Sequence, residues 1–180
     1  MSQTATKQPE ATGKKHPKET DEIRAVLDDY VAYQRRIDNN EERLAYLKDM
    51  AGSPSSPSLS GMPSGSRDGS SKQERDVLKQ LELEEKLSGM YEVENDKREQ
   101  IEGLIEQMED PDEQTVIEMR YLDRANYRAI SAALHGNETD YDEHERRYLK
   151  KTFKIHGSAL QSLAKIYNKE RGERNADRLI

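Results

Sequence analysis

Apolar residues recur every three or four positions along residues 20–50, the spacing that places them on one face of an α-helix. The recurring positions are Ile23, Val26, Tyr30, Tyr33, Ile37, Leu44 and Leu47. Thr20, followed by two acidic residues, is a helix-start signal. Asn40 holds the one polar place in this apolar stripe. If the stripe is buried against another helix, Asn40 favours one register of the pair; otherwise it marks a frayed point in a surface helix.

A second long helix is predicted over residues 72–109. Its apolar stripe consists of Leu83, Leu87, Met90, Ile101, Leu104 and Met108. Glu94 and Lys97 interrupt this stripe, so its middle is polar. Neither long helix can bury its stripe alone. We expect the two to pair as a helical hairpin or coiled coil, to form a homo-oligomer through residues 20–109, or to bind a partner.

Two segments lack this periodicity. Sixteen of the twenty-one residues from 51 to 71 are Ser, Gly or Pro, the composition of a flexible linker. Residues 1–19 are polar and contain two Pro, and they are predicted to be a disordered tail.

Capping signals divide the C-terminal part into short helices. Asp110 can cap a helix that begins at Pro111, with Glu113 at the capping-box position. The next helix is predicted to begin at Asn126 and to stop at Gly136, because Gly is common just after a helix.

The last helix is predicted to run from about residue 143 to residue 168, and residues 171–180 are expected to fray. Its apolar places are Leu149, Phe153, His156, Leu160, Leu163 and Tyr167. No segment has the pattern of a strand. The predicted fold is therefore all-α: a long helical hairpin or coiled coil, followed by a small three-helix domain over residues 110–170.

Composition agrees with this fold class and excludes several functions. Charged residues make up 36% of the chain and hydrophobic ones 32%, too few for one large core. The absence of Cys excludes disulfides, thiol catalysis and Cys-based zinc sites. No apolar run approaches the roughly 18 residues of a membrane-spanning helix. The N-terminus also lacks the apolar region of a secretory signal, so we expect a cytoplasmic protein without membrane contact.

The spacing of the His and acidic residues predicts neither a catalytic site nor a metal site. The four His residues have no metal-binding spacing and no HExxH motif. Asp140, Asp142 and Glu143 lack the Gly and terminal Glu of a calcium loop and are interpreted as a solvated acidic loop. We therefore expect no enzyme activity, no cofactor and no metal.

Charge is distributed unevenly along the chain, whose net charge is −7. Residues 1–110 carry a net charge of −8, whereas residues 111–180 carry +1. The stretch from 146 to 165 contains six basic residues and no acidic one. Five of them lie in the first half of the last helix: Arg146, Arg147, Lys150, Lys151 and Lys154. This basic face is either a DNA-binding surface, to which Thr152 and Ser158 would add hydrogen-bond donors, or an ordinary solvated helix face.

Two stretches also resemble a known family: EQTVIEMRYLDRANYRAISAAL and KTFKIHGSALQSLAKI. Together with the long helices and the linker, they resemble the ArpU/RinA-type late transcriptional regulators encoded by phages. The C-terminal half of those regulators is similar to the fourth conserved region of bacterial sigma factors. Tyr127 and Ile130 match the first helix of its helix-turn-helix, and residues 152–163 match the end of its recognition helix. Residues 136–147 lengthen the turn between these two helices.

The resemblance implies a DNA-binding regulator that acts on late promoters and is associated with the host nucleoid. Its implied partner is double-stranded DNA, and host RNA polymerase is a candidate partner. It places the basic helix in the DNA groove. We expect Arg124 and Arg128, at the start of the preceding helix, to clamp the phosphates. Two other interpretations stay open: a small terminase-like DNA-packaging subunit, and a structural coiled-coil protein that does not bind DNA.

Overall fold

The structure is a computed structural model that describes residues 20–52 and 72–177. The helices are α1 (Asp21–Gly52), α2 (Lys72–Ile105), α3 (Pro111–Ile117), α4 (Tyr127–His135) and α5 (Tyr141–Asp177), and a short π-helix, η1 (Glu118–Leu122), continues α3. The two described ranges contain no strand, so the fold is all-α as predicted. The predicted tail, residues 1–19, and residues 53–71 of the predicted linker lie outside the described residues.

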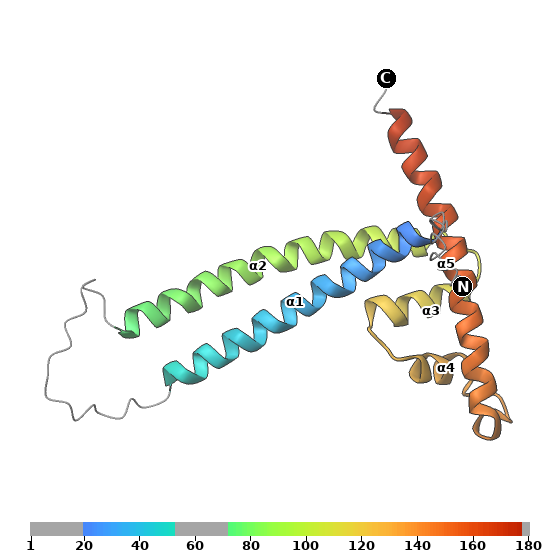
Figure 1. Ribbon diagram of the computed structural model, residues 1–180, viewed down its shortest axis with the longest axis horizontal. Coiled ribbons are helices and arrows are strands. Elements are labelled where there is room, and N and C mark those ends of the chain that lie inside the picture. The colour runs from blue at the N-terminus through green and yellow to red at the C-terminus, as the bar shows by residue number, and fades with distance from the viewer. Residues whose placement is uncertain (1–19, 53–71, 178–180) are drawn as a thin grey trace, which may run out of the picture.

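The two long helices form an antiparallel hairpin within one chain, which projects from the side of α5 (Figure 1). Their apolar stripes face each other: Ile37 packs against Leu83 and Leu87 in the outer half of the hairpin. Pairing within the chain is therefore the alternative that the structure supports. An oligomer formed through these helices would have to use their outer faces, where Leu78 and Leu81 are exposed.

The polar middle of α2 faces α1 and finds partners there. The hydroxyl of Tyr30 donates a hydrogen bond of 2.5 Å to Glu94, and the ammonium group of Lys97 lies 2.8 Å from the carboxylate of Asp29. The two charged residues that interrupt the predicted stripe are thus satisfied across the hairpin.

Asn40 points toward α2 and not to open solvent. Its side-chain amide donates to the carbonyl oxygen of Arg36 at 2.7 Å and lies 3.5 Å from the sulfur of Met90. Of the two interpretations of Asn40, the structure therefore favours a polar residue within the interhelical stripe.

We predict that Asn40→Leu raises the free energy of unfolding by about 1 kcal/mol, because it replaces a half-buried amide with an apolar side chain. The measurement is the midpoint of urea unfolding. Asn39→Leu is the matched control, because residue 39 is exposed and its substitution should leave the midpoint unchanged. An equal midpoint for wild type and Asn40→Leu would contradict the placement of residue 40 in the interface between α1 and α2.

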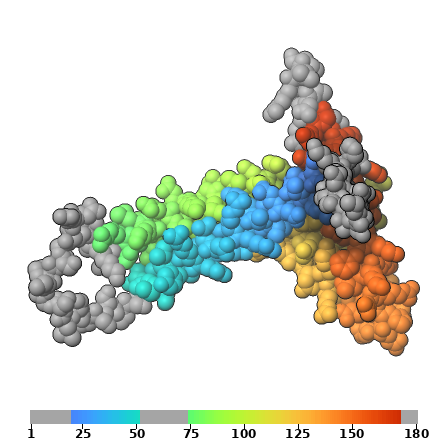
Figure 2. Space-filling model, viewed as in Figure 1, coloured from blue at the N-terminus to red at the C-terminus, as the bar shows by residue number. Residues whose placement is uncertain are grey.

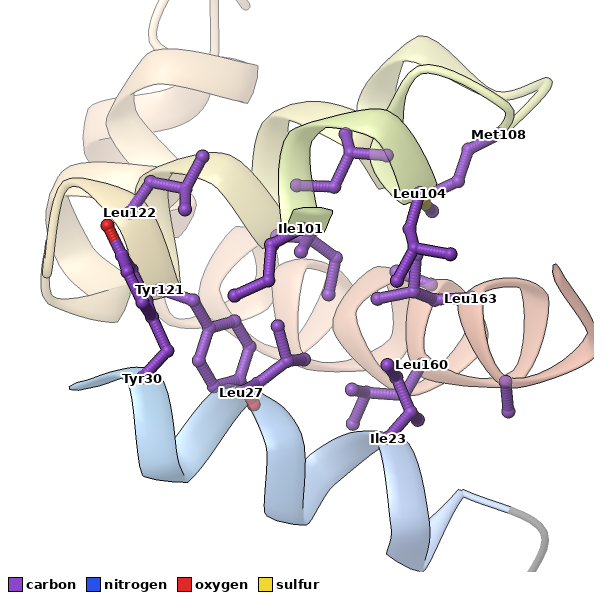
Figure 3. Close-up of a cluster of buried hydrophobic side chains, with 14 residues drawn as sticks. Ile23, Leu27, Tyr30, Ile101, Leu104, Met108, Tyr121, Leu122, Leu160 and Leu163 are labelled. Atoms are coloured by element: carbon purple, nitrogen blue, oxygen red, sulfur yellow. The ribbon is translucent and has the colours of Figure 1, made fainter. Parts of the chain in front are cut away.

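The largest hydrophobic core joins the base of the hairpin to the C-terminal helices. Figure 3 shows Ile23 and Leu27 of α1 beside Leu160 of α5, and the same cluster takes in Ile117 of α3 and Ile105 of α2. All five side chains are at most 2% exposed. The boundary expected at residue 110 therefore separates two groups of helices but not two hydrophobic cores.

The start of α3 follows its sequence signals only in part. Asp110 caps the helix, accepting hydrogen bonds from the backbone nitrogens of Asp112 and Glu113, and Pro111 is the first helical residue, as predicted. The Glu113 side chain does not complete a capping box. It is buried and accepts a hydrogen bond from the hydroxyl of Ser158 on α5, so it connects two helices instead.

Three helices have ends that differ from those predicted. α1 continues through the first two residues of the predicted linker, to Gly52, and α2 ends at Ile105 rather than at 109. α5 begins at Tyr141, is interrupted by the non-helical backbone of His144, and continues to Asp177, past residue 170 where fraying was expected. None of the helices within the described ranges has the length and apolar character needed to cross a membrane.

Candidate nucleic-acid interface

α4 and the first half of α5 form the pair that corresponds to the predicted helix-turn-helix. Asn126 caps α4, accepting hydrogen bonds of 3.0 Å from the backbone nitrogens of Arg128 and Ala129. Gly136 ends the helix as predicted, but with φ of −62° rather than in the left-handed conformation typical of this position. A Cβ at Gly136 would collide with the carbonyl oxygen of Ala132, so a close backbone approach explains the glycine.

The buried face of α5 near its start is not the predicted one. Tyr148 and Thr152 are buried, whereas Leu149 is half-buried and Phe153 is 48% exposed. The prediction that Leu149 and Phe153 lie in the apolar stripe was therefore wrong for Phe153. On this buried face α5 contacts α4, where His135 packs on the ring of Tyr148 with 5.2 Å between the ring centroids.

The five predicted basic residues are all exposed on α5. Successive residues of a helix turn by about 100°, so Lys150 and Lys154 lie about 160° around the helix from the buried Thr152. An open surface hollow of about 730 Å³ is lined by all five: Arg146, Arg147, Lys150, Lys151 and Lys154. These residues belong to the first half of α5, drawn in orange at the lower right of Figure 2, beside α3.

The acidic loop lies beside this basic face and neutralises part of it. Glu138 and Glu143 line the same hollow, and the guanidinium of Arg147 lies 3.8 Å from the carboxylate of Asp140. In the part of the chain that the structure describes, no acidic side chain forms an ion pair with Arg146, Lys150, Lys151 or Lys154. Four of the five cations are therefore available to an external anion.

The structure separates the two predicted phosphate clamps. Arg124 adopts a positive φ of 56° in the turn before α4 and forms an ion pair with Asp38 of α1, so it connects this turn to the hairpin. Arg128 has a side chain that is 81% exposed and lies 3.7 Å from Glu145. Both arginines thus have a carboxylate partner, but Arg128 is twice as exposed as Arg124, whose side chain is 41% exposed, and keeps the accessibility that a phosphate contact needs.

The two short donors predicted for this surface lie elsewhere. Thr152 is fully buried, and its hydroxyl donates to the carbonyl oxygen of Tyr148 at 3.1 Å. Ser158 donates to Glu113, as described above. Neither hydroxyl belongs to the basic face, because both satisfy partners within the fold.

An aromatic cluster beside the basic face was not predicted. His156 lies between two tyrosines, with its Nε2 3.2 Å from the hydroxyl of Tyr121 and its Nδ1 3.3 Å from the hydroxyl of Tyr127. The ring of Phe153 packs on Tyr127, with the centroids 4.3 Å apart. The sequence signal was the recurrence of aromatic residues at 121, 127, 153 and 156, but no spacing rule brings these positions together.

The burial of His156 in this cluster makes the stability of the protein depend on pH. Burial lowers the pKa of His156, the positive charges of Arg24 and Arg120 lower it further, and Asp28 opposes them. A neutral imidazole can donate to one tyrosine hydroxyl and accept from the other. Because the folded state disfavours the charged imidazole, the protein should lose stability as the pH falls through the ordinary pKa of histidine, near 6.5.

We therefore predict that the melting temperature decreases between about pH 7.5 and pH 6, and that His156→Gln reduces this decrease. Burial also lowers the pKa of His135, so part of the dependence should survive in the variant. Thermal unfolding followed by circular dichroism at several pH values is the measurement. His144→Gln, at an exposed position, is the control. Identical pH dependence in wild type and His156→Gln would contradict the prediction.

No group of acidic or His side chains among the described residues is arranged to hold a metal ion. In the acidic loop, Asp140 accepts a hydrogen bond of 2.5 Å from the hydroxyl of Tyr148. This bond lowers the pKa of Asp140 and connects the loop to α5.

Comparison with known families identifies residues 55–152 as matching DUF1492, which is described as a protein of unknown function. This match covers more than half of the chain. The chain belongs to the DUF1492 family. No curated protein and no solved structure matches it.

The DUF1492 match covers α2 to α4 and the start of α5, as far as Thr152. It therefore includes Arg146 to Lys151, whereas α1 and the second half of α5 lie outside it. The description of DUF1492 names no activity, so the likeness to late regulators and to sigma factors stays a prediction.

Proposed function

We propose that this protein is a phage-type transcriptional regulator that binds double-stranded DNA through the basic face of α5. The observation that carries the proposal is the set of five exposed cations opposite the buried face of α5, with α4 packed against that buried face. Cations so arranged can neutralise phosphates on both sides of a DNA groove. The segment that enters the groove begins after the interruption at His144.

The resemblance to sigma-like regulators adds the biological setting. It favours late promoters in the bacterial cytoplasm as the sites of action, and host RNA polymerase as a further partner. The hairpin has a role other than DNA binding in this proposal. α1 and α2 together are acidic, and an acidic surface is repelled by DNA. The hairpin would therefore extend away from the DNA.

We predict that binding to duplex DNA weakens with salt at a log–log slope of about −4 to −5 if five phosphate contacts form. Lys150→Ala/Lys154→Ala should reduce the magnitude of this slope by up to about 2, because it removes two of those contacts. Fluorescence anisotropy with a labelled duplex, over a range of salt concentrations, is the measurement.

Lys79→Ala/Lys86→Ala is the matched control, because it removes the same charge from exposed positions on α2. If the two double variants bind alike, DNA binding does not use the basic face of α5. The location of bound sites on a phage genome then tests the setting. Occupancy upstream of late genes supports regulation, whereas occupancy at the packaging site would point to a terminase-like subunit instead.

A further inference from the structure

Phe153 is an exposed aromatic residue beside the basic face. It is the only Phe in the chain, and it follows Lys150 by three positions and precedes Lys154 by one. Three residues turn by about 300° around a helix axis, so the side chains of Lys150 and Phe153 are only about 60° apart. The two residues are therefore neighbours on the surface of α5. An aromatic residue that is 48% exposed thus borders the cations proposed to contact DNA.

The ring of Phe153 is held in place by the aromatic cluster. One side packs on Tyr127 at 4.3 Å, and Tyr127 is itself covered by the guanidinium of Arg120, 4.9 Å from its ring centroid. Arg120 in turn donates to the carbonyl oxygen of Ala125 at 3.1 Å. The exposed part of Phe153 is therefore held in position before any ligand binds, which lowers the cost in conformational entropy of binding.

The cations around Phe153 favour an anionic ligand that also presents an apolar group. Duplex DNA presents one such group in its major groove, the C5-methyl of thymine, and Phe is among the side chains that contact it. An acidic protein surface is the alternative ligand. The cations of α5 lie on a single exposed helix face, as a helix that enters the major groove requires, and this arrangement favours DNA.

We infer that Phe153 is a specificity-determining residue of the DNA-binding surface, which contacts the methyl group of a thymine in the major groove. This inference rests on the proposed function. It assigns base recognition to an apolar side chain, whereas Lys150 and Lys154 contribute affinity through phosphates without regard to sequence. Replacing that thymine with uracil, which lacks only the methyl group, should weaken wild-type binding about fourfold, the effect of one buried methyl-sized group.

The experiment begins by enriching bound sequences from duplexes of random sequence with the wild-type protein. Each thymine of the enriched site is then replaced in turn by uracil, and affinities are measured for wild type, Phe153→Ala and Phe153→Leu. Phe153 is half-exposed, so both variants should fold, and circular dichroism checks this. The expected result is one thymine whose replacement costs wild type about fourfold and Phe153→Ala nothing, with a partial effect in Phe153→Leu.

The inference is overturned if wild type tolerates uracil at every position, if Phe153→Ala loses as much as wild type at the sensitive one, or if no sequence is enriched. These failures leave the proposed function standing as long as wild type binds duplexes with the expected dependence on salt. Failure of the proposed function has a different signature, namely no salt-dependent binding of any duplex. Unchanged DNA recognition by Phe153→Ala would leave an acidic protein surface as the ligand of this residue.

Discussion

A fragment of residues 106–170 should show no cooperative thermal unfolding, although it contains every residue of the predicted helix-turn-helix domain. The structure places the inner faces of α3, η1 and α5 against Ile23 and Leu27 of α1 and against Ile105 at the end of α2. Without these partners, Ile117 and Leu160 would be exposed to water. A helical fragment of this length is marginal even with a complete core, so the loss should prevent stable folding.

The measurement is circular dichroism as a function of temperature. The control is a chain of residues 20–180, which keeps both long helices and should melt cooperatively. A cooperative transition in the short fragment, near that of the intact protein, would show that the C-terminal helices form a core of their own.

Leu160→Ala should lower the free energy of unfolding of the intact protein by about 2–5 kcal/mol. Leu160 is 1% exposed and belongs to the shared core, so its truncation leaves a cavity that several helices would have to close together. Urea unfolding followed by circular dichroism measures the change.

Gln161→Ala is the matched control for this substitution. Residue 161 is exposed on the same helix, and its truncation should change stability by less than about 0.5 kcal/mol. Similar midpoints for the two variants would mean that the shared core does not stabilise the protein. Because Leu160 lies outside the basic face, the folded fraction of Leu160→Ala should bind DNA with the wild-type dependence on salt.

Much of the secondary structure could be predicted from local patterns. The spacing of apolar residues predicted both long helices, and Asp110 and Asn126 predicted the starts of α3 and α4, because a cap depends only on the few residues around it. The exposure of the five basic residues followed from the same logic, since charged side chains are rarely buried without a partner. The sequence by itself therefore determined the helices, the all-α class and the location of the basic face.

Contacts between distant segments decided the rest. The sequence left open what the long helices pair with, and the structure pairs them with each other and joins their inner ends to α5. It could not predict that Arg124 would meet Asp38, which lies 86 positions away. In α5, residue type favoured burial of Phe153, but the fold buries Thr152 instead, and the Thr152 hydroxyl is satisfied by the carbonyl oxygen of Tyr148 in the preceding turn. Polarity along the chain cannot reveal such choices, because the free energy of burial depends on which neighbour each face meets.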